Sequence, residues 1–239
     1  MLADNGTAPI LILCAHGTRD AAGQATIQAM AERVHQRLGV EVRLAFVDVQ
    51  EPSIDEVVLG IPERELGIAG VVVPYLLAGG YHVHVDIANA VRSRPDVVAA
   101  LPLGPDPRLI SIVRDRVAEA AVHPTATLVL AAAGSSDERS QADTERTLDA
   151  LRLAWDGPVR LGYAAGVEPT VAQAVEAARR FGEGEEDGDV AVVSYLLSPG
   201  FFQDRLCEAG ADHVTDPLAP DERLIDIIAD RYRDAGGVL

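Results

Sequence analysis

The chain has 239 residues, 48% of them hydrophobic, which is enough for one large domain or two small ones with a substantial core. A formal charge of −17 and an aromatic share of only 4% argue against a nucleic-acid partner, because phosphates are repelled and few rings can stack on bases. The longest apolar stretch, about residues 66–78, is too short to span a bilayer and contains Pro74, so we expect no membrane segment.

The N-terminal residues lack the basic start of a secretory signal, and their apolar part leads directly into an expected core strand. The two cysteines, Cys14 and Cys207, are too few for a disulfide framework. We therefore expect a cytoplasmic protein in which both cysteines are thiols.

Short apolar runs alternate with longer amphipathic stretches along the chain, a pattern typical of parallel strands joined by crossover helices. In the first half this pattern predicts strands near 9–14, 41–47, 68–74 and 97–101, and helices near 27–38, 53–60, 86–94 and 106–121. In the second half it predicts strands near 126–131, 158–163, 189–195 and 212–215. The acidic segment 181–189 is predicted to be a surface loop.

The two halves of the chain repeat one another. LCAHGTRD matches LAAAGSSD, VVVPYLLAGG matches AVVSYLLSPG, and PLGPDPRLISIVRDR matches PLAPDERLIDIIADR, in the same order along the chain. The sequence therefore predicts an α/β fold of two similar doubly wound lobes, residues 1–122 and 123–239, each a four-stranded parallel sheet flanked by helices. Such a chain resembles a dimer of single-lobe units, so we expect a monomer with an internal pseudo-dimer.

The histidines distinguish the two copies. His16 stands opposite Ala133 in the repeat, and His82 stands opposite Phe202. His16 follows the first predicted strand and His82 the third, and these strands are neighbours in the common order 2-1-3-4, whose carboxyl ends form a ligand-binding edge. One histidine at a strand end is more often a hydrogen-bonded loop residue, but two that converge favour a site for Fe, Co, Ni or Zn.

Other residues near this edge are weaker candidates. Asp48 follows the second strand and can add a carboxylate, while a buried inert thiol is the expected state of Cys14. His84 points away from His82 if the segment is helical. Three arginines flank the two histidine segments and are either partners of substrate carboxylates or solvated surface residues: Arg19, Arg92 and Arg94.

The segments CAHGTRD, FVDVQEPSI and VVVPYLLAGGYHVHVDI resemble those of the sirohydrochlorin chelatases, the class II chelatase family, and the resemblance covers nearly the whole chain. It implies insertion of cobalt, ferrous iron or nickel into sirohydrochlorin, in cobalamin or siroheme biosynthesis, with no organic cofactor. It also implies that His16 and His82 handle the metal, that Asp48 assists where the family often has glutamate, and that the second half is a divergent copy. Substrate contacts are expected from Arg19, Gly80, Tyr81 and Arg92.

Two other functions remain open at this point. A carrier of metal or of metallated tetrapyrrole would use the same residues without catalysis. A hydrolase or transferase with His16 as general base is less favoured, because the chain has no GxSxG segment and no phosphate-binding glycine loop.

Overall fold

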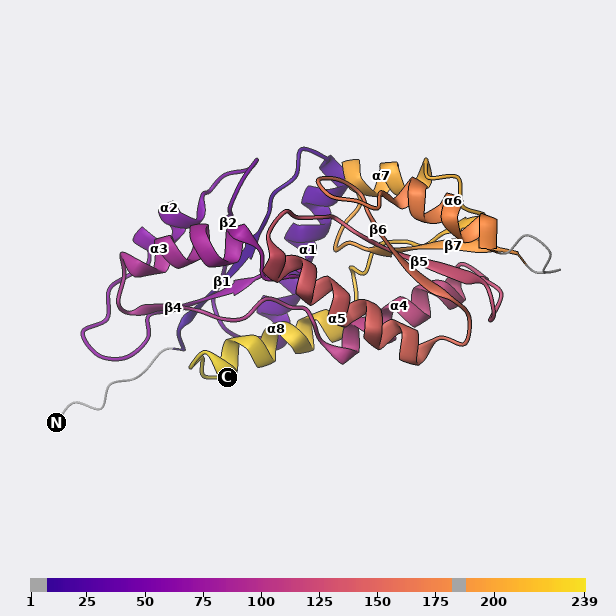
Figure 1. The fold of residues 1–239 in the computed structure, drawn as a ribbon. Coiled ribbons are helices and arrows are strands. Elements are labelled where there is room, and N and C mark those ends of the chain that lie inside the picture. Colours follow the sequence, from indigo (N-terminus) through magenta and orange to yellow (C-terminus); the bar gives the residue numbers. More distant parts are fainter. Residues whose placement is uncertain (1–7, 182–187) are drawn as a thin grey trace.

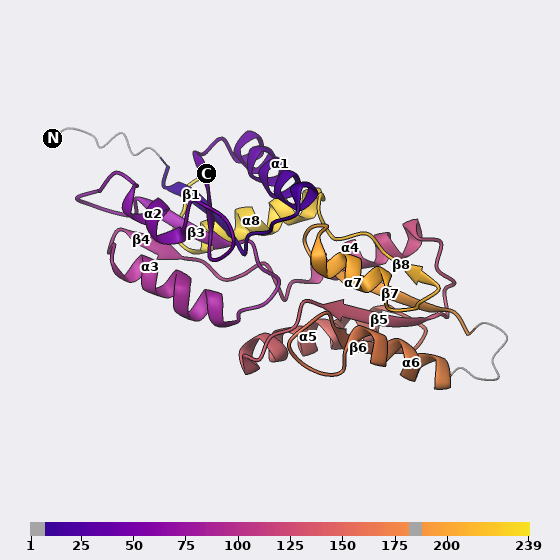
Figure 2. The same cartoon turned by 90° about the horizontal axis from the view of Figure 1, so that it is seen from above.

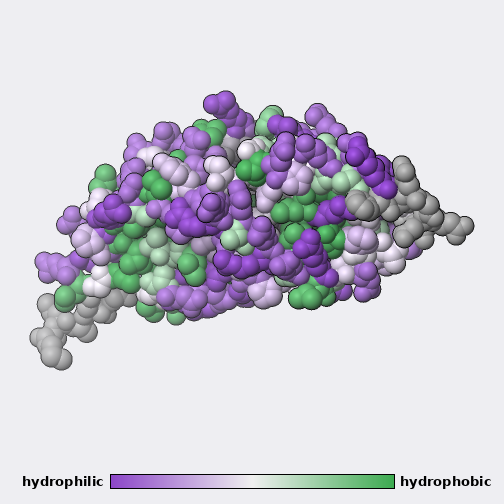
Figure 3. Space-filling model, in the orientation of Figure 1, coloured by the Kyte–Doolittle hydropathy of each residue, from purple (hydrophilic) through white to green (hydrophobic). Residues whose placement is uncertain are grey.

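The computed structural model describes residues 8–181 and 188–239 and shows two α/β lobes next to each other (Figure 1). Most of the acidic segment predicted to be a surface loop lies outside these described residues. Among the described helices, none has the length and apolar character required to cross a membrane. Hydrophilic residues cover much of the face drawn in Figure 3, with smaller hydrophobic areas between them.

The first sheet has four parallel strands in the order β2-β1-β3-β4. The strands are β1 (Ile10–Ala15), β2 (Val42–Phe46), β3 (Gly70–Pro74) and β4 (Val97–Ala99). The helices of the first half are α1 (Ala21–Leu38), α2 (Ile54–Leu59), a π-helix η1 (His82–Ile87) continued by α3 (Ala88–Arg92), and α4 (Pro107–Glu119). The predicted helix at 86–94 therefore begins four residues earlier, at His82.

The second sheet repeats this order as β6-β5-β7-β8, again with all strands parallel. The strands are β5 (Thr127–Ala132), β6 (Val159–Tyr163), β7 (Val190–Tyr195) and β8 (His213–Val214). The helices are α5 (Glu138–Ala154), α6 (Val171–Phe181), α7 (Phe201–Cys207) and α8 (Glu222–Asp234). The predicted fold class and the predicted strand order are confirmed.

Local sequence explains where the helices start and how the strands are buried. Asp20 and Asp137 cap α1 and α5 by accepting from backbone N–H groups, and Ser53 with Glu56 forms a capping box at α2. Along β1, Leu11 and Leu13 pack on one face of the sheet, whereas Ile12 and Cys14 pack on the other. Both faces are apolar because helices cover both, as a parallel sheet requires.

The last helix of each half packs on the sheet of the other half. Helix α8 lies against α1 and β3 of the first lobe, and α4 lies against α5 and β7 of the second, as Figures 1 and 2 show. The buried Tyr232 hydroxyl on α8 donates to the Pro9 carbonyl at 2.6 Å. Arg231 on α8 donates to the Pro102 carbonyl at 2.8 Å. Each packed lobe thus contains the last helix of the other half of the sequence: α8 belongs to the first lobe and α4 to the second.

This exchange joins the two lobes through one hydrophobic core. The same buried cluster contains Leu13 of β1, Ile227 of α8, Ile112 of α4 and Leu130 of β5. Reciprocal ion pairs join α4 to α8, Arg108 to Asp230 at 2.6 Å and Arg223 to Asp115 at 2.7 Å, as expected for two copies related by a pseudo-twofold axis.

The carboxyl edges of the two sheets meet at the junction between the lobes. We call residues 16–20, 47–50 and 75–82 the first rim, and residues 133–137, 164–167 and 196–202 the second rim. Gly79 on the first rim donates its N–H to Asp143 of α5 at 2.8 Å. On the second rim Gly200 is packed so closely that an added Cβ would lie 3.2 Å from Cβ of Asp20. The loops after the strands therefore contact the opposite lobe.

Candidate metal and tetrapyrrole site

His16 is the first residue after β1 and is held by the loop after β2. The His16 carbonyl accepts a hydrogen bond from the Asp48 N–H at 3.0 Å. The preceding residues form the same kind of bond, from the Val47 N–H to the Ala15 carbonyl. Gly17 has a φ of +97°, and a Cβ there would overlap the Asp48 carbonyl oxygen. Only glycine fits this turn without strain, and the turn places the His16 side chain on the first rim.

His82 opens the π-helix that follows β3. Its Nδ1 lies 2.7 Å from Oδ2 of Asp86, and each of the two side chains is about one third exposed, at 33% and 31%. A carboxylate only accepts hydrogen bonds, so this contact keeps the proton on Nδ1 and leaves Nε2 free as a ligand or base. Short π-helical segments often occur at functional sites, and this one places His82 on the first rim.

The structure brings His16 and His82 together. Their ring centroids lie 4.7 Å apart, and the ring planes are nearly perpendicular at 82°. The exposed Tyr81 ring meets His82 edge-on, with centroids 5.9 Å apart. The predicted convergence of the two distant histidines is therefore observed.

The surroundings of His16 favour its neutral form. Partial burial and the neighbouring His82 lower the pKa of His16 below its usual value, while a backbone interaction with Gly17 and the charge of Asp48 oppose this shift. Burial, together with the charge of Asp86, raises the pKa of Cys14 to about 12. Cys14 is thus a buried protonated thiol beneath the histidines, in agreement with the sequence analysis.

The remaining predicted residues occupy different places. Asp48 is exposed on the first rim and accepts from the Val49 N–H at 2.8 Å through Oδ1. Arg19 is exposed in the loop after His16, and Gly80 packs against the second lobe, where an added Cβ would lie 3.3 Å from Cβ of Ser140. Arg92 is exposed at the end of α3, which leads away from the rim towards the start of β4.

Arg94 has a structural role in place of the substrate contact considered from the sequence. It is only 6% exposed, and it pairs with Asp96 at 2.9 Å. It also donates to the carbonyls of Val58 and Ile61. A buried guanidinium with all these partners holds the end of α2 and is not free to bind substrate.

Asp86 is a candidate site residue that was not predicted from the sequence. A histidine and a carboxylate four residues apart lie on the same face of a helix, so the spacing of His82 and Asp86 could have predicted their contact. His84 is exposed and lies near Gly79 of the first rim. The pKa of Asp137 on the second rim is lowered mainly by its hydrogen bonds with Arg139, and the charge of His84 adds a smaller contribution. His84 does not join the pair formed by His16 and His82.

Within residues 8–181 and 188–239, no group of three or more His, Cys, Asp or Glu side chains is arranged to hold a metal ion. The histidine pair therefore offers two nitrogens and no complete ligand cage. Stable protein-bound zinc usually has four protein ligands, or three in catalytic sites. A pair of imidazoles is suited to hold a cation briefly and to release it to a stronger chelator.

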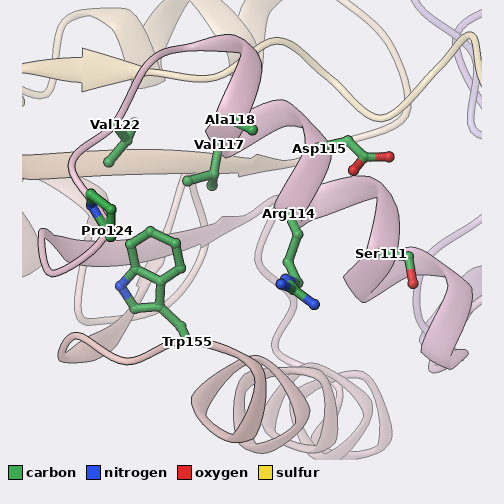
Figure 4. Close-up of a pocket in the computed structure, with 8 residues that line it drawn as sticks. All are labelled: Ser111, Arg114, Asp115, Val117, Ala118, Val122, Pro124 and Trp155. Atoms are coloured by element: carbon green, nitrogen blue, oxygen red, sulfur yellow. The ribbon is translucent and has the colours of Figure 1, made fainter.

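Two surface cavities of about 430 Å³ each lie outside the histidine pair. One lies between α4 and the end of α5, where Trp155, Pro124 and Val122 form an apolar side and Arg114 extends towards it (Figure 4). The other lies between α1 and β2 and includes Gln50, whose side chain accepts from the Thr18 N–H at 2.8 Å. The titratable chemistry is concentrated at the first rim, so we place the candidate site there.

Comparison with known proteins gives consistent matches for both halves. The model of the CbiX family matches residues 10–120 and again residues 127–235. A sirohydrochlorin cobaltochelatase of Sulfolobus acidocaldarius is 30% identical over 113 residues, which cover 46% of this chain and 90% of that protein. The archaeal protein thus corresponds to about one half of the chain.

Solved structures show the same two-lobe fold. SirB from Bacillus subtilis with Fe3+ aligns with a TM-score of 0.73 and 20% identity, covering 95% of this chain and 96% of that chain. The sirohydrochlorin chelatase SirB from Bacillus subtilis subspecies spizizenii in complex with cobalt aligns with a TM-score of 0.69, 20% identity and coverage of 95% and 94%. Because the family model matches almost the entire length, once in each half, the chain belongs to the CbiX family.

Proposed function

We propose that this protein inserts a divalent metal, cobalt or ferrous iron, into sirohydrochlorin, in cobalamin or siroheme biosynthesis. The observation that carries the proposal is the pair of imidazoles from His16 and His82, with ring centroids 4.7 Å apart on the rim that faces the second lobe. Support also comes from the relatives, which are named as chelatases, and from the two SirB structures, which contain iron or cobalt. Insertion of nickel, which the resemblance also implies, stays a prediction.

Metal insertion exchanges two pyrrole N–H protons of the macrocycle for one divalent cation. The protein must therefore hold a partly dehydrated cation near the ring face and accept the protons that leave. Neutral imidazole does both, and a lowered pKa keeps His16 neutral near pH 7. We assign His16 and His82 as shared metal ligands, and each accepts one of the two leaving protons once the cation has moved from its nitrogen to the macrocycle.

Two carboxylates support the histidines in different ways. Asp86 fixes the tautomer and the ring orientation of His82 through the 2.7 Å contact with Nδ1, as carboxylates commonly do for ligand histidines. Asp48 is exposed on the rim and acts on His16 through its charge, which suits delivery of an incoming cation. No organic cofactor is needed for this exchange, since no electrons are transferred.

Alanine variants at the two histidines test the assignment. We expect His16→Ala and His82→Ala each to reduce the rate of metal insertion at least about 100-fold, followed by the spectral change of the pigment. His123→Ala is a matched control, since His123 lies on the surface at the join between the halves, next to Thr125. Undiminished insertion in either rim variant contradicts the assignment.

The same assay separates catalysis from transport. A carrier of metal or metallated pigment binds its cargo tightly but does not accelerate insertion above the spontaneous rate.

We also propose that the chain acts as a monomer, because the exchanged helices already join two lobes in one core. The cytoplasmic location expected from the sequence stays a prediction.

A further inference from the structure

The second rim presents exposed aromatic rings where the first rim presents a histidine. Phe201 and Phe202 begin α7 and occupy the repeat positions of Tyr81 and His82. Their ring centroids lie 5.8 Å apart, and the residues are 66% and 36% exposed. The rings are therefore not part of the hydrophobic core.

The exposure of two adjacent phenylalanines is unfavourable for the folded protein alone. The chain has only four phenylalanines, and removal of such a large apolar side chain from water is strongly favourable. Large exposed apolar groups at one place on a surface commonly mark a binding site. This pair lies at the carboxyl edge of a parallel sheet, where ligands of doubly wound folds bind.

The start of α7 contacts the loop that carries His16. Gly200, the residue before Phe201, lies close to Asp20 and to the Thr18 hydroxyl. Pro199 also lies close to α1: a Cβ added at Gly23 of α1 would lie 2.8 Å from the Pro199 carbonyl oxygen. The start of α7, which carries the aromatic pair, consequently lies at the junction of the lobes, against the loop that follows His16.

A cation accompanies the rings. The guanidinium carbon of Arg205 lies 5.7 Å from the centroid of the Phe201 ring, within the range of a cation–π contact, and Arg205 is exposed. A planar ring next to a guanidinium complements a flat macrocycle that carries carboxylates on its edge. This combination also places one positive charge beside the rings, in a chain whose net charge is −17.

We propose that Phe201, Phe202 and Arg205 form the second side of the substrate site. The rings contact the tetrapyrrole plane, and Arg205 pairs with a peripheral carboxylate, while the histidines approach from the first lobe. This inference rests on the proposed chelatase function. It gives the second lobe a role in holding the pigment, since Phe202 and Ala133 replace the metal-handling residues there.

The test measures binding of metal-free sirohydrochlorin by the full chain, through quenching of the pigment fluorescence, together with steady-state insertion kinetics. We expect Phe201→Ala to weaken pigment binding about 10-fold and Arg205→Gln about five-fold, with Arg205→Lys retaining most of the affinity. The KM for the metal should remain unchanged, because none of these side chains contacts the cation. Circular dichroism verifies that each variant is folded.

Leu153→Ala and Arg180→Gln are matched controls. Both side chains are exposed on the second lobe, one on α5 and one on α6, and neither lies on a rim. If pigment affinity is unchanged in Phe201→Ala and Arg205→Gln, the inference is overturned even when chelation is intact. If the wild type binds pigment but inserts no metal, the proposed catalysis fails, and weaker binding in the two variants still supports the inference. A wild type that binds no pigment overturns both.

Discussion

The glycine after His16 offers a test of how the first rim works. Gly17 has a φ of +97°, and a Cβ would overlap the Asp48 carbonyl oxygen, so Gly17→Ala combines a strained backbone with a steric clash. The left-handed conformation costs about 1–2 kcal/mol for a residue other than glycine, and overpacking typically costs a further 1–3 kcal/mol. We expect a loss of about 2–5 kcal/mol, or a Tm lower by about 4–20 °C for a chain of this size.

The repeat provides an internal control for this variant. Gly134 is the equivalent residue of the second lobe, with a φ of +94° and a Cβ position that overlaps the Ala165 carbonyl oxygen. Gly134→Ala should therefore destabilise the protein to a similar extent. It leaves His16 and His82 in place, however, because the residue opposite His16 is Ala133.

Thermal unfolding followed by circular dichroism, together with insertion rates well below the Tm, separates the two effects. We expect Gly17→Ala to lose up to about 100-fold in rate, since a displacement of about 1 Å at a reacting group can cost that much. Gly134→Ala should stay within about threefold of the wild type when it is equally folded. Equal loss of activity in both variants at equal fractions of folded protein would refute the reasoning that Gly17 serves to place His16.

Three further measurements test particular contacts. The imidazole of His16 should titrate below its usual value of 6.5 in an NMR experiment on the metal-free protein, because burial and His82 lower its pKa, so a midpoint above 6.5 contradicts the site geometry. Hydrogen bonds with Arg94 lower the pKa of Asp96 from 3.8 to about 2. The ionised Asp96 side chain therefore stabilises the folded protein fully at pH values above 3.8, and this stabilisation is lost as the pH falls towards 2. Asp96→Asn should cost about 1–3 kcal/mol in urea unfolding at pH 7 and reduce the pH dependence between 4 and 2, and an unchanged midpoint would argue against a structural pair. Tyr232→Phe should cost about 1–3 kcal/mol in the same assay, because the buried Pro9 carbonyl loses its donor, and no change would mean that water replaces the hydroxyl.

Much of the fold was predictable because the relevant signals are local. The continuous apolar runs of β1 and β5, the caps at Asp20 and Asp137, and the match of the two halves can all be read from short stretches of chain. The π-helix that starts at His82 was not predicted, because the histidines and the preceding glycines conceal the start of the helical pattern. The carboxylate that orients His82 was missed for the same reason.

The sequence by itself determined the alternation of strands and helices, the internal repeat, and the fact that only the first copy retains His16 and His82. Tertiary structure alone decided that α4 and α8 exchange lobes, that the two rims face each other, and that Arg94 is buried against the end of α2 and is not available at the site. The physical reason is that periodicity shows that a helix has an apolar face but not which of two similar sheets covers that face. That choice depends on contacts between residues more than 100 positions apart, such as Arg108 with Asp230 and Tyr232 with Pro9.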